Sequence, residues 1–91
     1  MTKDIYQVEL LGPARRAISE RIPQSIAIAV LEFCSGPLAE NPYRVGKELF
    51  GPLKGCFGAR RSTYRIVYRI DEERHIIFVL DVAHRKDVYR H

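Results

Sequence analysis

The chain has 91 residues, a length that fits one small domain, so residues 1–91 are expected to form a single folding unit. Hydrophobic residues make up 46% of the chain and charged residues 29%, proportions that exclude wholesale disorder. Two cysteines are too few for a disulfide framework, and the net charge of +4 excludes an acidic protein.

The positive charge is concentrated in the second half of the chain. Residues 1–43 carry four Lys or Arg against five Asp or Glu, whereas residues 44–91 carry eleven against six. This asymmetry predicts a polyanionic partner for the C-terminal half. Charge alone is equally compatible with a basic protein that has no nucleic-acid role.

Compartment and cofactor use follow from what the sequence contains. The first residues, Met1 to Asp4, lack an apolar signal region, and the longest wholly apolar run, Ile26 to Leu31, is far shorter than a membrane span. We therefore expect a cytoplasmic protein with no membrane partner. Cys34 lies on an apolar helical pattern and is predicted to be a buried free thiol. Cys34 and Cys56 form no metal-spaced pair, so neither a metal nor a cofactor is expected.

The first half of the chain predicts one strand and two helices. Residues 5–10 alternate as a strand does, and Pro13 is well placed to begin a short helix that runs to about Arg21. Pro23 breaks the helical pattern and separates a second helix from the first. That helix has an apolar stripe facing the core and is predicted to stop at residues 35–37, which read Ser-Gly-Pro. The stripe comprises Ile26, Val30, Phe33 and Cys34, with Ala27 and Leu31 beside it.

The second half predicts a loop followed by three strands. Residues 36–54 are rich in Gly and Pro and indicate a loop or broken segment. The strands are expected at 55–61, 63–70 and 76–83, with the last two joined as an antiparallel hairpin by the turn at 71–74. The predicted fold class is α+β: an N-terminal strand, a two-helix hairpin, then an antiparallel sheet with helices on one face.

The strand over residues 63–70 has two chemically different faces. Successive side chains point to opposite sides of a strand, so Arg65 and Arg69 share one face. Tyr64, Ile66, Tyr68 and Ile70 share the other face, which is suited to packing against helices. The arginine face is therefore left open and is suited to holding a phosphate-rich ligand.

Two motifs resemble the RelE/ParE toxin superfamily of bacterial toxin–antitoxin systems. The first is Gly-x-x-x-Ala-Arg-Arg-x-x-Tyr-Arg-x-x-Tyr over residues 55–68, and the second is His-Arg-x-x-x-Tyr over residues 84–89. The helical hairpin broken at Ile22-Pro23 and the segment 41–49 extend the likeness over nearly the whole chain. The resemblance implies a RelE-like fold. It also implies either cleavage of mRNA in the ribosomal A site, as in the RelE branch, or poisoning of DNA gyrase, as in the ParE branch.

The resemblance also implies roles for particular residues. Arg65 is the candidate phosphate clamp, although a solvated arginine paired with Asp81 is the simpler alternative. Arg85 is expected to support the scissile phosphate, and Tyr89 to stack on the nucleotide or to pack the C-terminal tail. His84 is a candidate general acid or base, or a buried or edge residue. The expected RNA-binding residues are Arg44, Lys47, Lys54, Arg60 and Arg61.

The sequence leaves the base and the precise activity open. Some RelE toxins place lysines on the strand before the arginine pair, where this chain has Cys56 and Gly58. The base is then Lys47, Lys54, His84 or an arginine. The expected activity is metal-free attack by the 2′-OH in a ribosome-dependent mRNA endoribonuclease, with mRNA and the ribosome as partners. The alternatives are a gyrase-inhibiting toxin and a catalytically weak protein-binding member of the same fold.

A cognate antitoxin is the remaining partner that the resemblance implies. It is expected to be RelB-like, with an acidic or apolar segment that folds on binding to the basic half of the toxin.

Overall fold

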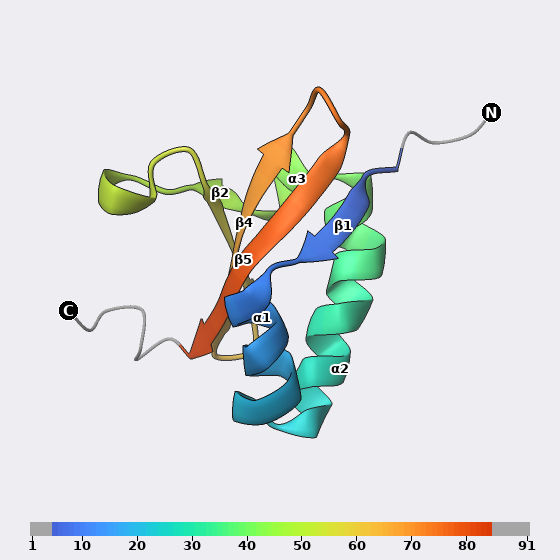
Figure 1. The fold of residues 1–91 in the computed structure, drawn as a ribbon, viewed down its shortest axis with the longest axis vertical. Coiled ribbons are helices and arrows are strands. Elements are labelled where there is room, and N and C mark those ends of the chain that lie inside the picture. The colour runs from blue at the N-terminus through green and yellow to red at the C-terminus, as the bar shows by residue number, and fades with distance from the viewer. Residues whose placement is uncertain (1–4, 85–91) are drawn as a thin grey trace.

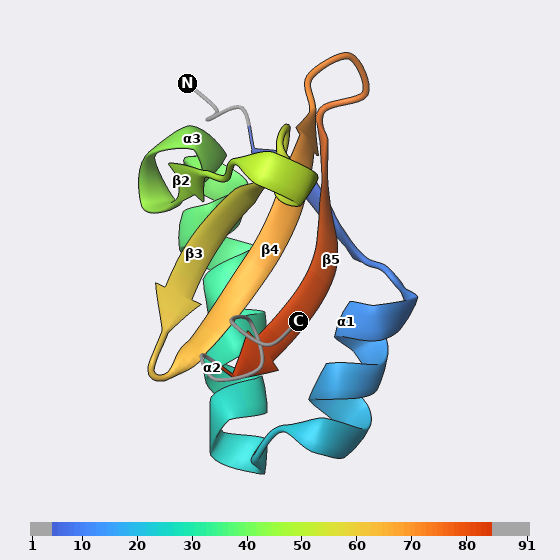
Figure 2. The ribbon, with the colours of Figure 1, turned by 90° about the vertical axis from the view of Figure 1, so that its left-hand side faces the viewer.

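The computed structural model describes residues 5–84 and shows helices packed against one face of a five-stranded sheet (Figures 1 and 2). The strand order is β1-β5-β4-β3-β2. The strands are β1 (Gln7–Leu10), β2 (Lys47–Glu48), β3 (Phe57–Arg61), β4 (Tyr64–Asp71) and β5 (Ile76–His84). The predicted α+β class is confirmed. The sheet is mixed rather than wholly antiparallel, because β1 runs parallel to β5. All the other helices and strands lie between these two strands in the chain.

The predicted helical hairpin is present, and its break lies where Pro23 indicated. The first arm comprises α1 (Gly12–Arg16) and the π-helical turn η1 (Ala17–Arg21), and the second begins with α2 (Gln24–Phe33). Ile22, before the proline, is extended, with φ −103° and ψ 152°. Within residues 5–84, no helix is both long and apolar enough to cross a membrane.

The predicted helix stop at residues 35–37 is wrong. The chain remains helical through η2 (Cys34–Leu38), a π-helical turn that contains Pro37. A wider turn accommodates a residue that has no N–H to donate, and the Asn41 N–H bonds to the Pro37 carbonyl at 2.9 Å. Burial of Cys34 and Leu38 holds this turn against the core. Tertiary packing therefore overrides the local stop signal.

The segment expected to be a loop contains three short elements. These are α3 (Pro42–Val45), β2 and the 3₁₀ turn η3 (Gly51–Leu53). The α3 turn is tied to the β4–β5 hairpin by Glu72, whose Oε2 accepts hydrogen bonds from Tyr43 at 2.6 Å and from Tyr6 at 2.5 Å. These two phenol donors lower the pKa of Glu72.

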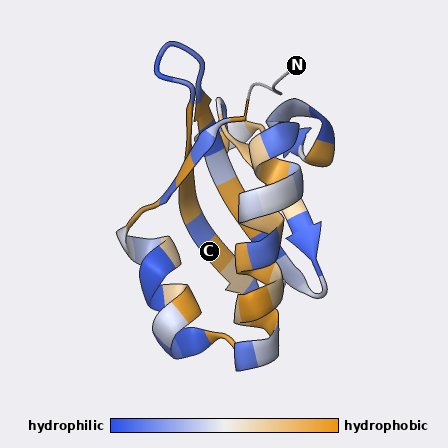
Figure 3. Ribbon diagram, turned by 90° about the vertical axis from the view of Figure 1, so that its right-hand side faces the viewer, coloured by the Kyte–Doolittle hydropathy of each residue, from blue (hydrophilic) through white to orange (hydrophobic). Residues whose placement is uncertain are grey.

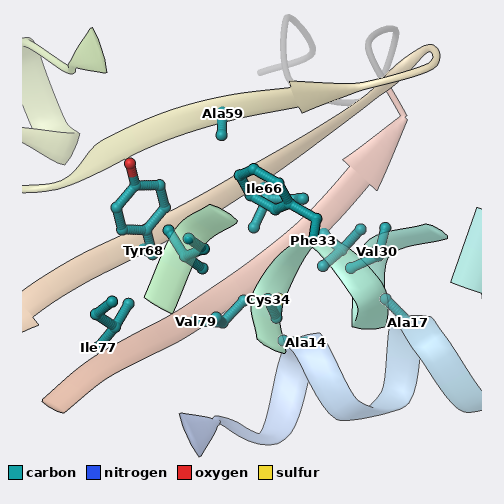
Figure 4. Packing of buried hydrophobic residues seen from close by; sticks show 12 residues of the cluster. Ala14, Ala17, Val30, Phe33, Cys34, Ala59, Ile66, Tyr68, Ile77 and Val79 are labelled. Carbon is teal, nitrogen blue, oxygen red and sulfur yellow. The ribbon is translucent and has the colours of Figure 1, made fainter. Parts of the chain in front are cut away.

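The core lies between the sheet and the helices (Figures 3 and 4). The predicted helical stripe is largely confirmed, since Val30, Phe33 and Cys34 are buried, whereas Leu31 is exposed. Cys34 is a buried free thiol, as expected. Burial raises the pKa of this thiol to about 11, against a smaller lowering by Arg61, so the unreactive thiol form dominates.

The core face of β5 changes phase along the strand. Ile77 and Val79 are buried two residues apart, but the next buried residue is Val82. The cause is a bulge in the pairing with β4: Val67 lies opposite Asp81, whereas Tyr68 lies opposite Val79. The extra residue on β5 shifts its alternation by one, so His84 at the end of the strand points to the same face as Val82.

Tyr68 joins the sheet to the segment that carries α3 and β2. Its side chain is fully buried, stacks on Phe57 with ring centroids 5.7 Å apart, and donates a hydrogen bond to the Pro42 carbonyl at 2.5 Å. Burial raises the pKa of Tyr68 to about 12. Gly46 covers the phenol, because a Cβ atom there would overlap Tyr68 Oη and come within 3.0 Å of the Gly58 carbonyl oxygen.

We expect Gly46→Ala to lower the free energy of unfolding by about 1–3 kcal/mol, because the added methyl group displaces a buried, hydrogen-bonded ring. Gly36→Ala is the matched control, since a Cβ atom at Gly36 meets no atom within 4 Å and alanine favours the helix. Urea unfolding of both variants measures the difference. Equal stability of the two would show that the contact with Tyr68 does not matter.

Candidate functional site

A hollow of about 460 Å³ lies beside the sheet face that the helices leave uncovered, the face shown in Figure 2. Strands β2, β3 and β4 form its floor. The segment that leads into η3 stands beside it and projects away from the helices (Figure 1). The lining residues are Val45, Gly46, Lys47, Leu49, Gly58, Ala59, Arg60, Ser62, Thr63, Tyr64 and Arg65.

Strand register brings three cations into this hollow. Lys47 on β2 lies directly opposite Gly58 on β3, and Arg60 on β3 lies directly opposite Arg65 on β4. Directly opposed residues of antiparallel strands point to the same face. Among the described residues that line the hollow there is no Asp or Glu. Because opposed like charges repel each other, the arrangement favours binding of an anion between them.

Gly58 gives Arg65 room to lie over the floor of the hollow. A Cβ atom at Gly58 would be 3.0 Å from Arg65 Nε and 3.1 Å from Leu49 Cδ2, closer than most real Cβ contacts. The Arg65 side chain therefore occupies space that any other residue at position 58 would contest. Leu49, the residue after β2, contacts the same space and supplies an apolar wall beside the cations.

The alternative ion pair between Arg65 and Asp81 is absent. Arg65 lies opposite Ala83 in the sheet, and Asp81 lies opposite Val67. Asp81 Oδ1 is instead 3.9 Å from Arg21 Nη2 and accepts a hydrogen bond from the Val82 N–H. Within residues 5–84, Arg65 makes no ion pair, so its charge is available to a ligand.

The other residues predicted for the site have different positions. Arg44 on α3 and Lys54 after η3 are exposed but do not line the hollow. Arg61, predicted to bind RNA with Arg60, is not on the open face. It lies opposite Tyr64 on the helix-covered face, with its guanidinium carbon 3.8 Å from the centre of the Phe33 ring. Strand alternation separates it from its neighbour Arg60.

His84 also lies on the helix-covered face. Its ring contacts Tyr64 edge to face, with centroids 5.1 Å apart. His84 is the last residue of β5, and the sheet separates it from Arg65 on the open face. Arg85 and Tyr89 lie outside the described residues.

The geometry fits a site that binds phosphate through cations. Two guanidinium groups and one ammonium converge beside an apolar wall, and a guanidinium can hold two phosphate oxygens at once. Within residues 5–84, no three His, Cys, Asp or Glu side chains lie together as a metal site requires.

Sequence reasoning missed Gly58 and Leu49 as parts of the site. It treated Gly58 as a lost lysine, whereas Lys47 comes to the same place from the adjacent strand. β2 has two residues, too few for an alternating pattern to reveal it.

Comparison with known proteins agrees with this architecture. The family model described as the ParE toxin of the type II toxin–antitoxin system parDE matches residues 6–89. Toxin RelG of Mycobacterium tuberculosis is 47% identical over 85 residues, which cover 93% of this chain and 97% of that protein. Toxin RelE of the same organism is 42% identical over 85 residues, covering 93% of this chain and 87% of that protein.

Solved structures give the same result. A chain of the toxin–antitoxin complex RelBE2 from M. tuberculosis superposes with a TM-score of 0.83 at 46% identity, covering 89% of this chain and 99% of that chain. The isolated E. coli RelE toxin shares the fold, with a TM-score of 0.70 at 18% identity over 87% of this chain and 83% of that one.

The fold and its open cationic face thus define a small toxin domain of the RelE type. The chain belongs to the RelE/ParE superfamily and is a toxin of a type II toxin–antitoxin system.

We expect Gly58→Ala to weaken growth arrest on induced expression, because the added methyl group displaces Arg65 or Leu49 by a few tenths of an ångström. If Gly58 acts through Arg65, Gly58→Ala has no further effect in an Arg65→Ala background. Growth curves and melting temperatures of the two single variants and the double variant measure this coupling. Additive losses of toxicity would show that Gly58 acts independently of Arg65.

Proposed function

We propose that this toxin is a ribosome-dependent mRNA endoribonuclease that uses no metal. The observation that carries the proposal is the convergence of Lys47, Arg60 and Arg65 on an open sheet face whose described lining has no carboxylate. Such a site offsets the negative charge that develops on a phosphorus under attack. The names of the two M. tuberculosis relatives support the RelE branch.

The proposed reaction is an internal transfer within the RNA. The 2′-oxygen attacks the adjacent phosphorus, the bond from phosphorus to the 5′-oxygen breaks, and a 2′,3′-cyclic phosphate forms. The 2′-OH loses its proton to a base, and the departing 5′-oxygen gains one from an acid. Arg65 and Arg60 bind the non-bridging oxygens, whose charge increases in the transition state.

Lys47 is the member of this cation group that is suited to proton transfer. A guanidinium stays charged at any physiological pH, whereas an amine can release and regain a proton. On β2 it lies directly opposite Gly58, the β3 position at which some RelE toxins carry a lysine. Arg85 and Tyr89 remain proposed members of the site, for the phosphate and the nucleotide respectively.

The shape of the site supports dependence on the ribosome. The hollow is open, and the described part of the chain encloses little of a substrate RNA. A scaffold that holds the mRNA strand in place would supply the orientation that such a surface does not, and orientation is a large part of catalysis.

We expect Arg65→Ala to slow mRNA cleavage by roughly a hundredfold or more, because one phosphate-binding cation is lost. Its stability should change by less than about 1 kcal/mol, since no core contact is removed. Arg69→Ala is the matched control: Arg69 lies on the same face of β4 but outside the hollow, against Phe78. Mapping of new mRNA 5′ ends after induction measures cleavage.

Cleavage sites in register with the reading frame would support action in the ribosome, and equal loss in both arginine variants would contradict the assigned site. Pulse labelling of protein and DNA synthesis in the same culture separates this activity from gyrase poisoning. An early arrest of DNA synthesis with intact mRNA would refute the endoribonuclease.

An antitoxin that covers the open face is the proposed partner. Solved relatives include RelBE complexes of a toxin with its antitoxin. The cations of the hollow and the exposed apolar residues beside it suit an acidic or apolar segment that folds on binding.

We expect co-expression with the product of the neighbouring gene to restore growth and to yield a complex that co-purifies. Addition of that protein should also displace RNA from the toxin, because both occupy the same cations. Size-exclusion chromatography and an RNA-binding competition measure these effects. A complex that forms while RNA stays bound would place the antitoxin elsewhere on the toxin.

A further inference from the structure

Phe50 is the most exposed large hydrophobic residue of the described chain, with 82% of its surface accessible to solvent. It lies between Leu49, which lines the hollow, and the turn η3, which projects from the open face (Figure 1). Leaving an aromatic ring in water is unfavourable, and the ring supplies no core packing in return. Its position next in sequence to a residue that lines the cationic hollow is therefore the feature that requires an explanation.

The segment that carries Phe50 has a defined backbone. The Leu49 N–H bonds to the Cys56 carbonyl at 2.9 Å, the Lys54 N–H to the Gly51 carbonyl at 3.0 Å, and the Cys56 N–H to the Leu53 carbonyl at 3.0 Å. Gly51 and Gly55 have φ values of 70° and 93°, which other residues rarely adopt. These constraints hold the backbone on both sides of Phe50 in place, while its ring stays exposed.

The surroundings of Phe50 fit single-stranded nucleic acid. Proteins that bind such strands combine cations that follow the phosphates with aromatic rings on which bases stack. Lys47, Arg60 and Arg65 supply the first element, Lys54 adds charge at the far end of the turn, and Phe50 supplies the second. Because any base can stack on the ring, this contact adds affinity without strict sequence preference.

We infer that Phe50 is a stacking platform for a nucleobase of an RNA strand whose phosphate is held in the hollow. The inference rests on the proposed function, since it specifies how the same site grips RNA. It adds to the phosphate contacts a contact with a base of the same strand.

The chain offers a direct probe of this contact, because it contains no tryptophan. Phe50→Trp therefore places a single reporter on the turn, and stacking of a base on an indole quenches its fluorescence. Ile28→Trp is the matched control, since Ile28 is also an exposed hydrophobic residue but lies on α2, on the helix side of the sheet. A short RNA with 2′-O-methyl groups serves as ligand, because it cannot be cleaved, and an abasic strand of equal length tests the role of the bases.

We expect the RNA to quench Phe50→Trp and the abasic strand to leave it unquenched, with Ile28→Trp unaffected by both. In the protein without the added tryptophan, Phe50→Ala should weaken RNA binding roughly tenfold. Phe50→Leu should weaken it similarly, and Phe50→Tyr should retain it. Fluorescence anisotropy of labelled RNA at fixed salt measures these affinities.

The failures of the two proposals are distinguishable. RNA that binds in a manner dependent on Arg65 but leaves Phe50→Trp unquenched overturns the stacking role and preserves the RNA site. Absence of RNA binding to the isolated protein overturns the stacking role, whereas intact mRNA in cells that the toxin has arrested overturns the proposed function. Normal RNA binding by Phe50→Ala with loss of neutralisation by the antitoxin would assign Phe50 to the protein partner and overturn the inference.

Discussion

The hydrogen bond from Tyr68 to the Pro42 carbonyl is the contact on which the site depends. Tyr68 belongs to the core face of β4, and Pro42 begins the segment that leads to β2. The buried phenol holds this segment at Pro42 and packs under Gly46. It thereby sets the register in which the next residue, Lys47, pairs with Gly58. A residue of the core thus places a cation on the opposite face of the sheet, where it faces solvent and ligand.

Separation of charge between the two faces follows from strand alternation. Arg60 and Arg61 are neighbours in sequence, yet Arg60 lines the hollow and Arg61 lies on the ring of Phe33. The guanidinium of Arg61 covers the ring of Phe33 on α2, and a guanidinium on an aromatic face is stabilised. One arginine of the pair is therefore structural, and the other is free for an anion.

Absence of a carboxylate among the described residues of the hollow connects its structure to its proposed chemistry. Cations without a nearby carboxylate repel one another and lower the stability of the folded protein. If these cations were only structural, an adjacent Asp or Glu would be expected to pair with them. Asp81, which the sequence offered as a partner for Arg65, instead pairs with Arg21. The unbalanced charge of the open face is thus relieved by binding, either of RNA phosphates or of an acidic antitoxin segment.

Local patterns of the sequence determined the α+β class, the helical break at Pro23, the β4–β5 hairpin and the two faces of β4, because each depends on alternation or on backbone restriction. The motif over residues 55–68 determined the superfamily. Only tertiary structure decided the helical course through Pro37, the parallel pairing of β1, the bulge that turns His84 to the covered face and the meeting of Lys47 with Gly58. These features depend on packing and pairing between residues distant in sequence, which no local pattern records.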